Sequence, residues 1–379
     1  MSPRKFHIGL IGFGFIGKVH ANAYRSIPYA FKQPVVTASL QAVLRSKKQP
    51  EEQFLSDIET KCCFSKEEFY NQPLDIIDIC TPNFLHREQA IEALSHGLHV
   101  YCEKPLGANL SDAREIAKIA RKVGSFTHTA FIFRYLPAVR QSKSIIDAGL
   151  IGEVFNFRSH YFHSSYINPN RPISWRLKKA SSGGGTLTDL GIHLIDLVRY
   201  LLGETAWVQC ITRTFIGERP PLLGSSKFEI VDVDDWALCT LGMQNNAVGI
   251  IEVTRMAGGT PDSLKLEIFG SQGTIEINLA DPGLVKYFDE KKQQWRIGDL
   301  GLSTPKDEHP IEQLWPNSKM ALGLFINAHL ASVYDFLKYI NEGKDSSINF
   351  QTALADQEIL EAAYISASRK GERIKLPLL

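Results

Sequence analysis

The sequence predicts an α/β domain built on a doubly wound parallel sheet, followed by an α+β domain with a large, mostly antiparallel open sheet. Three observations lead to this prediction: an apolar run that enters a glycine loop at residue 12, alternating strand and helix patterns up to residue 131, and strand-like runs that dominate later. Because 379 residues exceed what one core usually holds, we expect two domains, over residues 1–131 and 132–379.

The first strand, Phe6–Ile11, leads into Gly12-Phe13-Gly14-Phe15-Ile16-Gly17 and then into a helical pattern. This context favours a dinucleotide-binding loop over an ordinary glycine-rich turn. Gly12 would allow the tight turn, Gly14 would let the backbone approach a pyrophosphate, and Gly17 would let the helix pack on the strand. The N–H groups that begin the helix would then face the phosphates.

The remaining elements of the first domain follow from apolar periodicity, and their alternation implies parallel strands. We expect strands ending near Leu44 and over Asp75–Cys80, Leu98–Cys102 and Phe126–Phe131, with helices over Phe84–His96 and Asp112–Val123.

In the second domain, apolar alternation predicts strands and apolar spacings of three and four predict helices. The expected strands are Val154–Phe162, Ala206–Thr214, Val233–Leu241, Ala247–Thr254, Leu264–Phe269 and Thr274–Asn278, and the expected helices are Pro137–Ala148, Leu187–Leu202, Phe325–Asn341 and Thr352–Lys370.

Composition limits the partners. The net charge is +1, so no overall field favours nucleic acid or a membrane surface, and no uncharged apolar stretch has the length of a membrane span. The six cysteines include no C-x-x-C pair, which is typical of reduced thiols. We therefore expect a cytoplasmic protein without nucleic-acid or membrane partners.

The loop after the second strand bears on the cofactor. An NAD enzyme usually carries an acidic residue here, to bind the ribose 2′-hydroxyl. No acidic residue occurs between Gly17 and Glu51, and the loop offers Arg45, Ser46, Lys47 and Lys48. These groups suit a 2′-phosphate, so the sequence favours NADP, with NAD possible. The alternative is a solvated basic loop in an NAD enzyme.

Two further loops follow strands of the parallel sheet, where ligands bind. Thr81-Pro82-Asn83 precedes His86, and Asn83 would bond a ribose or amide, or else cap a helix. In Glu103-Lys104-Pro105 the proline keeps Lys104 out of helical geometry, which places it near a nicotinamide. The alternative is an ordinary surface lysine.

Asp189 and His193 are four residues apart in a predicted helix that follows Gly183-Gly184-Gly185. The spacing puts both side chains on one face, and the glycines permit close approach of another group. A core histidine is the alternative. With Asp196 the pair would offer three metal ligands, but we see no clear fourth one and expect no metal.

Taken together, these motifs resemble the glucose–fructose oxidoreductase/inositol dehydrogenase (Gfo/Idh/MocA) family over essentially the whole chain. The resemblance implies a Rossmann domain that binds the cofactor, a second domain whose open sheet forms a homodimer or homotetramer interface, and a Lys–Pro bond that is frequently cis. It rests on the glycine loop, Thr81-Pro82-Asn83 with His86, Glu103-Lys104-Pro105, Arg134-Tyr135-x-Pro137, Trp175-Arg176 and the segment from Gly183 to His193.

By this resemblance Lys104, Asp189 and His193 match the family's catalytic residues. They would transfer a hydride between nicotinamide and a secondary alcohol carbon of a sugar, sugar derivative or cyclitol. The alternatives are an NAD-dependent glycosidase of the same superfamily, a non-catalytic NADP-binding sensor, and a reductase of a non-sugar carbonyl or imine. Candidates for the substrate pocket are Tyr135, Tyr161, His163, Trp175 and Arg176.

Overall fold

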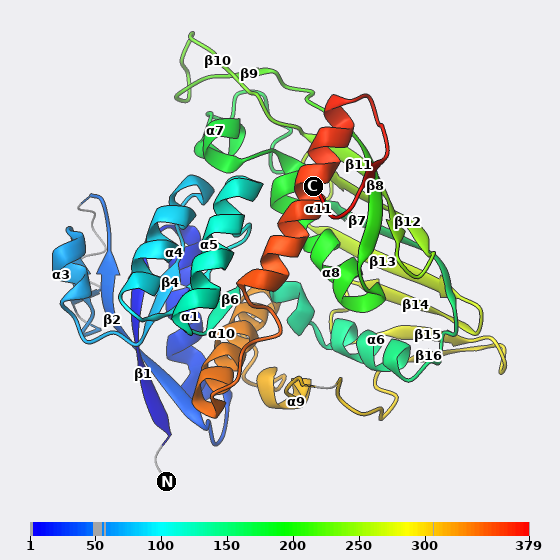
Figure 1. Ribbon diagram of the computed structural model, residues 1–379, viewed down its shortest axis with the longest axis horizontal. Helices are drawn as coiled ribbons and strands as arrows, with labels where there is room; N and C mark the ends of the chain where they lie inside the picture. Colours follow the sequence, from blue (N-terminus) through cyan, green and yellow to red (C-terminus); the bar gives the residue numbers. More distant parts are fainter. Residues whose placement is uncertain (1–2, 48–54, 57, 306, 379) are drawn as a thin grey trace. The chain divides into compact units, whose positions relative to one another are not determined.

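The computed structural model describes residues 3–47, 55–56, 58–305 and 307–378. The chain divides into two compact units (Figure 1). The first comprises residues 1–107, 111–135 and 309–353, and the second comprises residues 108–110, 136–308 and 354–379. A single boundary at residue 131 is therefore too simple, because residues 309–353 return to the first unit.

The first unit contains the predicted parallel sheet. Among its described residues, six strands pair in the order β3-β2-β1-β4-β5-β6, and every pair is parallel. The strands are β1 (Arg4–Ile11), β2 (Val36–Leu44), β3 (Lys61–Cys63), β4 (Ile76–Ile79), β5 (His99–Cys102) and β6 (Thr127–Thr129). The helices are α1 (Phe15–Ala30), α3 (Lys66–Tyr70), α4 (His86–Ser95), α5 (Leu110–Val123), α9 (Ile311–Leu314) and α10 (Leu324–Glu342), with the short turns η1 (Asn83–Leu85) and η2 (Ile132–Tyr135).

The central strands of this sheet are largely apolar, as expected for strands that are buried on both faces. A parallel sheet is covered on both faces, so neither face needs polar side chains. Phe6, Ile8 and Leu10 of β1 have no exposed surface, and neither do Ile76 and Ile77 of β4.

Helix α10 explains why residues 309–353 belong to the first unit. It contacts α1 and β2, and the ring of Tyr334 stacks on that of Phe31 at a centroid distance of 4.3 Å. Its buried apolar residues include Leu330, Val333 and Leu337, which share the helical spacing of three and four. The sequence pattern predicts this helix correctly, but not the sheet that it covers.

The second unit contains the predicted mostly antiparallel sheet. Among its described residues, nine strands pair in the order β16-β15-β14-β13-β7-β12-β11-β8-β17, and only the β7–β12 pair is parallel. The strands are β7 (Val154–Phe162), β8 (Thr205–Arg213), β11 (Trp236–Met243), β12 (Val248–Thr254), β13 (Ser263–Gly270), β14 (Gly273–Asn278), β15 (Lys286–Asp289), β16 (Gln294–Ile297) and β17 (Ile374–Lys375), and a separate pair joins β9 (Glu218–Arg219) to β10 (Glu229–Ile230).

The two faces of this sheet differ in burial, as alternation along its strands requires. Val208, Cys239 and Ile251 are buried on the inner face, whereas Val248 and Ile250 of β12 are exposed on the outer face. Helices α6 and α8 contact the sheet, and the hydroxyl of Ser366 in α11 accepts from the backbone N–H of Cys210 in β8, at 2.8 Å. The helices of this unit are α6 (Pro137–Asp147), α7 (Lys179–Ser182), α8 (Ile192–Leu202) and α11 (Phe350–Ser368), with the turns η3 (Trp175–Leu177) and η4 (Leu187–Gly191).

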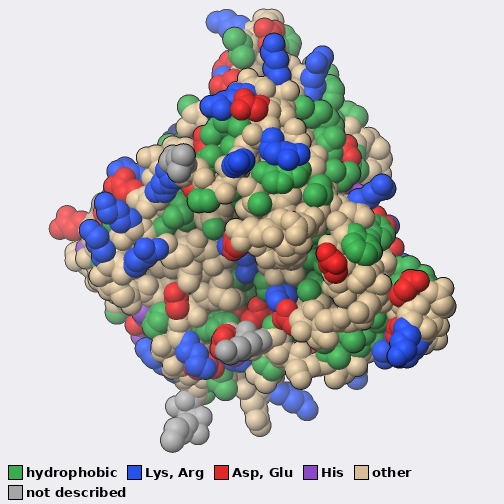
Figure 2. All heavy atoms as spheres, turned by 45° about the vertical axis from the view of Figure 1, so that its right-hand side comes forward, with side chains coloured by type: hydrophobic (Ala, Val, Ile, Leu, Met, Phe, Trp, Pro, Cys, Tyr) green, Lys and Arg blue, Asp and Glu red, His purple; other side chains and the backbone are tan. Residues whose placement is uncertain are grey.

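On the face drawn in Figure 2, Lys and Arg side chains are interspersed with Asp and Glu side chains. The charges on this face are therefore not gathered into a field of one sign. None of the described helices combines the length and the apolar character that a membrane span requires. All six cysteines, which lie within the described ranges, are free thiols.

Candidate active site

The glycine loop between β1 and α1 has the geometry that a pyrophosphate-binding turn requires. Gly12 has φ +91°, which favours glycine. A Cβ on Gly14 would meet nothing within 4 Å, whereas one on Gly17 would lie 2.3 Å from the carbonyl oxygen of Gly12. The backbone is thus open at Gly14 and tightly packed at Gly17. No side chain caps the start of α1, where Phe15 is exposed and Ile16 is half-buried.

The loop after β2 presents its basic residues in two different ways. Arg45 is buried, with its guanidinium 5.8 Å from the centroid of the Phe13 ring in the glycine loop. Its backbone N–H donates to the carbonyl oxygen of Cys63, at 3.0 Å. Ser46 and Lys47 are exposed, and Lys48 lies outside the described residues. The loop therefore offers a hydroxyl and an ammonium group at the surface beside the glycine loop.

The loop after β4 is tied to the loop after β5 by His86. Its imidazole is completely buried, with Nδ1 2.9 Å from the carbonyl oxygen of Pro105 and Nε2 3.0 Å from that of Thr81. Burial lowers the pKa of His86, and the neighbouring carbonyls oppose this shift. Because both ring nitrogens face the protein backbone, His86 is placed to position the two loops. These contacts account for both ring nitrogens, and a direct role of His86 in cofactor binding stays a prediction.

The side chain of Thr81 is also engaged within the first unit, and Asn83 is placed there by a short turn. The hydroxyl of Thr81 donates to Oε1 of Gln89 at 2.6 Å. Asn83 is buried and begins the turn η1, whose N-cap is Pro82, so the predicted alternative of a helix cap at Asn83 is wrong.

The corner after β5 consists of Glu103, Lys104 and Pro105. The Lys104–Pro105 peptide bond is cis, as the resemblance implies. Oε2 of Glu103 accepts a hydrogen bond from the backbone N–H of Lys104, at 3.2 Å. Glu103 is buried and Lys104 is half-buried. The carboxylate is thus fixed against the backbone of the lysine, and the ammonium belongs to a partly exposed side chain.

In the second unit, four predicted site residues gather at one end of α8. Asp189 lies on η4 and His193 in the first turn of α8, and the His193 ring lies 6.4 Å from that of Tyr161. Burial raises the pKa of Tyr161, and the charges of Asp262 and Asp189 raise it further. Burial lowers the pKa of His163, which Asp189 opposes. An acid, two imidazoles and a phenol therefore share one environment.

The carboxylate of Asp234 fixes the backbone just before Asp189. Its Oδ1 accepts from the backbone N–H of Gly185 at 2.9 Å and from the hydroxyl of Tyr364 at 2.8 Å, and its Oδ2 accepts from the N–H of Leu187 at 2.8 Å. A Cβ on Gly185 would lie 2.0 Å from the carbonyl oxygen of Asp234, so only glycine fits there. The segment continues as a π turn over η4, where the sequence predicts a regular helix. Such turns are frequent at functional sites.

Replacing Asp234 with asparagine is expected to lower the free energy of unfolding by about 2 kcal/mol. In the wild-type protein both carboxylate oxygens accept hydrogen bonds, whereas in the variant the amide NH₂ would face one of these buried donors and could not accept from it. Urea unfolding followed by circular dichroism measures the loss. The matched control is Asp232→Asn. Asp232 is exposed and accepts from one backbone N–H, that of Lys179. Equal losses in the two variants would contradict this role of Asp234.

The remaining pocket candidates have different environments. The guanidinium of Arg176, which is exposed, lies 4.3 Å from the centroid of the half-buried Trp175 ring. Tyr135 is completely buried in the first unit, where its hydroxyl donates to Oδ2 of Asp335 at 2.8 Å. Its burial and this bond are those of a core residue, and its role in the substrate pocket stays a prediction.

Comparison with known proteins gives this arrangement a family. Residues 6–131 match the profile described as "Oxidoreductase family, NAD-binding Rossmann fold", and residues 139–276 match the "GFO/IDH/MocA C-terminal domain". The chain belongs to the Gfo/Idh/MocA family. It is an oxidoreductase with a Rossmann domain for a nicotinamide cofactor, as predicted from its motifs.

Several members of this family are similar over most of the chain. Levoglucosan dehydrogenase of Pseudarthrobacter phenanthrenivorans is 32% identical over 95% of this chain and 96% of its own length. Glucose-6-phosphate 3-dehydrogenase of Bacillus subtilis is 29% identical over 74% of this chain and 77% of its own. The solved structure of levoglucosan dehydrogenase with NADH and L-sorbose has a TM-score of 0.89 at 30% identity, covering 99% of this chain and 100% of that one.

Sequence reasoning missed residues that act only through the fold. Asp234 is 45 residues from Asp189, and no local motif marks it. Asp262, whose Oδ1 accepts from the Tyr161 hydroxyl at 3.3 Å, lies in a loop before β13. His20 follows Gly17, the last glycine of the GxGxxG motif, by three residues. This short distance along the chain is the sequence feature that places His20 next to the glycine loop.

Proposed function

We propose that this family member is an NAD(P)-dependent dehydrogenase of a sugar, sugar derivative or cyclitol. The observation that carries the proposal is the grouping of Asp189, His193, Tyr161 and His163 at one end of α8, in a chain whose relatives include proteins named levoglucosan dehydrogenase and glucose-6-phosphate 3-dehydrogenase. Polar groups and an aromatic ring in one place suit a polyol, which offers hydroxyls and an apolar ring face.

In the proposed reaction, the alcohol carbon gives a hydride to nicotinamide C4 while its hydroxyl gives a proton to His193, and a carbonyl forms. The cofactor supplies the hydride acceptor. The ammonium of Lys104 donates a hydrogen bond to the reacting oxygen and stabilises its developing negative charge. Asp189 orients the hydroxyl or the imidazole. Reduction of a ketone follows the same path backwards.

We propose that Lys104 and His193 act on the same oxygen, the roles that the family resemblance implies for them. Within the second unit, a Cβ on Gly183 would lie 1.9 Å from the carbonyl oxygen of Ala108, so the glycine run that precedes Asp189 is tightly packed.

The function is tested with purified protein, NAD⁺ or NADP⁺, and a panel of aldoses, anhydrosugars and inositols, by following the absorbance of the reduced nicotinamide. Sustained, substrate-dependent reduction is the expected result. Tightly retained cofactor with no net reduction would favour the glycosidase alternative. Binding without any turnover would indicate a sensor.

We propose NADP as the preferred cofactor. Support comes from the loop after β2, where Ser46 and Lys47 are exposed beside Arg45 and no acidic residue lies between Gly17 and Glu51. Solved complexes of levoglucosan dehydrogenase contain NADH, so the preference of this chain needs a direct measurement.

Wild-type protein is expected to bind NADPH more tightly than NADH in a fluorescence titration. Ser46→Asp and Lys47→Ala are each expected to lower this preference about tenfold, which equals about 1.4 kcal/mol, because the 2′-phosphate would meet a carboxylate or lose a cation. Lys32→Ala removes another exposed lysine and should leave the ratio unchanged. Tighter binding of NADH by wild-type protein would overturn the preference.

We also propose that the chain forms a homodimer or homotetramer through the outer face of the second unit's sheet. Ile211, Val248 and Ile250 are exposed there, and Leu238 lies beside Ile211 in the strand register. Contiguous apolar side chains on a sheet face are typical of an interaction surface.

A further inference from the structure

A buried polar cluster in the first unit brings together three elements that are distant in sequence. His20 comes from α1, Glu103 from the end of β5 and His329 from α10. One ligand atom from each lies within 4.8 Å of the others. The three residues are 0%, 9% and 2% exposed. Two imidazoles and a carboxylate therefore converge where water has little access.

Nε2 of His20 and Oε1 of Glu103 face each other as an ion pair, but neither atom makes a hydrogen bond to the described residues. Both ring nitrogens of His329 also lack a hydrogen bond within the described part of the chain. The other oxygen of Glu103 is engaged by the backbone N–H of Lys104. A buried polar atom without a hydrogen-bond partner lowers the stability of the fold. A bound group that contacts all three residues would remove this cost.

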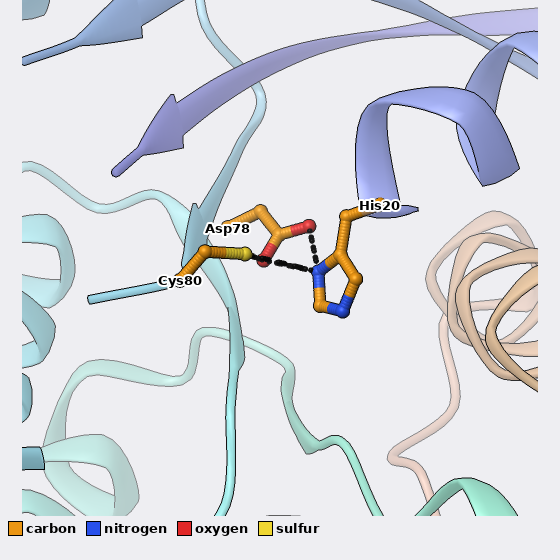
Figure 3. Close-up of side chains that lie close together, drawn as sticks. All are labelled: His20, Asp78 and Cys80. Atoms are coloured by element: carbon orange, nitrogen blue, oxygen red, sulfur yellow. Dashed lines mark hydrogen bonds and ion pairs between the residues drawn. The ribbon is translucent and has the colours of Figure 1, made fainter. Parts of the chain in front are cut away.

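The opposite side of the His20 ring is already engaged. Nδ1 lies 2.9 and 3.0 Å from the two oxygens of Asp78 and 3.1 Å from Sγ of Cys80 (Figure 3). A carboxylate on one imidazole nitrogen is the arrangement that orients a metal-binding histidine, because it holds the proton there and leaves the lone pair on the other nitrogen. Asp78 thus directs Nε2 of His20 into the cluster.

We propose that His20, Glu103 and His329 bind a divalent metal ion, with Zn²⁺ as the best match. Two imidazole nitrogens and a carboxylate oxygen are ligands that zinc prefers. Nε2 of His20 lies 3.2 Å from Oε1 of Glu103, close to the roughly 3.3 Å that separates two ligands about 2.0 Å from a tetrahedral zinc ion. The two charges of the ion offset those of Glu103 and Asp78.

The site lies beneath the corner that carries Lys104, and it would hold Glu103 to α1 and α10. It goes beyond the proposed function, since it assigns a metal that the hydride transfer does not use. Its binding is also measurable without any sugar or cofactor, so failure of the proposed reaction would leave it standing.

The test is metal analysis of the full-length protein after chelation, reloading with Zn²⁺ and removal of excess metal. We expect one zinc ion per chain in wild-type protein and in His7→Asn, which removes a histidine outside the cluster. His329→Leu should retain none. Asp78→Asn should bind zinc about 10–100-fold more weakly, the usual effect of losing the carboxylate that supports a metal-binding histidine. Zinc should raise Tm in wild-type protein but not in His329→Leu.

Loading the wild-type protein with Co²⁺ tests the site without any variant, and so does not depend on whether His329→Leu folds. Wild-type protein loaded with Co²⁺ should show the visible absorption of a tetrahedral site, and added Zn²⁺ should abolish it. Wild-type protein that retains no Zn²⁺ and shows no such absorption would overturn the proposal. In that case a protonated His20, which lies between Asp78 and Glu103, would supply the positive charge in the cluster.

Discussion

Replacing Lys104 with methionine is expected to lower kcat about 10²–10³-fold, the usual cost of removing one donor that stabilises a developing oxyanion. Methionine matches the apolar stem of lysine up to Cε, but it has no ammonium group and so no N–H to donate. The backbone N–H of Lys104, which donates to Glu103, is retained. The glycine loop is untouched, so NADPH binding should change little.

The measurement pairs steady-state kinetics on the best sugar with a fluorescence titration of the cofactor. Lys122→Met, at an exposed position of α5 in the same unit, is the matched control and should have wild-type kcat. A kcat for Lys104→Met within a factor of two of wild type would remove the lysine from the mechanism. A parallel loss of cofactor binding would instead assign it to the cofactor site.

Much of the fold could be predicted because its signals are local. Apolar runs bounded by loops place β4 and β5 within one or two residues, and β7 has the predicted bounds. Alternation of strand and helix predicts parallel pairing, since the connections leave no other simple topology. The turn at Gly12 is likewise encoded in adjacent residues.

The errors occur where distant residues decide the outcome. Nothing local shows that α10 packs on α1 and so returns residues 309–353 to the first unit. Strands β15 and β16 are four residues each, too short for a clear alternation. The π turn that begins at Leu187 follows from contacts with Asp234, which the periodicity of residues 187–202 cannot reveal.

The same limit applies to the site. The four-residue spacing of Asp189 and His193 predicts that they lie close together, and the structure places them on the consecutive elements η4 and α8. Tyr135 and His86 occur in motifs as clear as these, but both are completely buried, with Tyr135 bonded to the Asp335 side chain and His86 in contact with two backbone carbonyls. A motif identifies the chemistry that a side chain has, whereas its surroundings decide whether a ligand reaches it.

Replacing His193 with alanine is expected to lower kcat about 10²–10⁴-fold, the contribution that a positioned general base usually makes. In the double variant with Lys104→Met, the combined loss should be smaller than the product of the two single losses if both groups act on one oxygen, because each depends on the other for its full effect. Initial rates with saturating sugar and cofactor measure both effects. His96→Asn, at an exposed position after α4, should keep wild-type activity. Losses that multiply fully would place Lys104 and His193 in independent steps, and an unchanged rate for His193→Ala would leave the proton to another group.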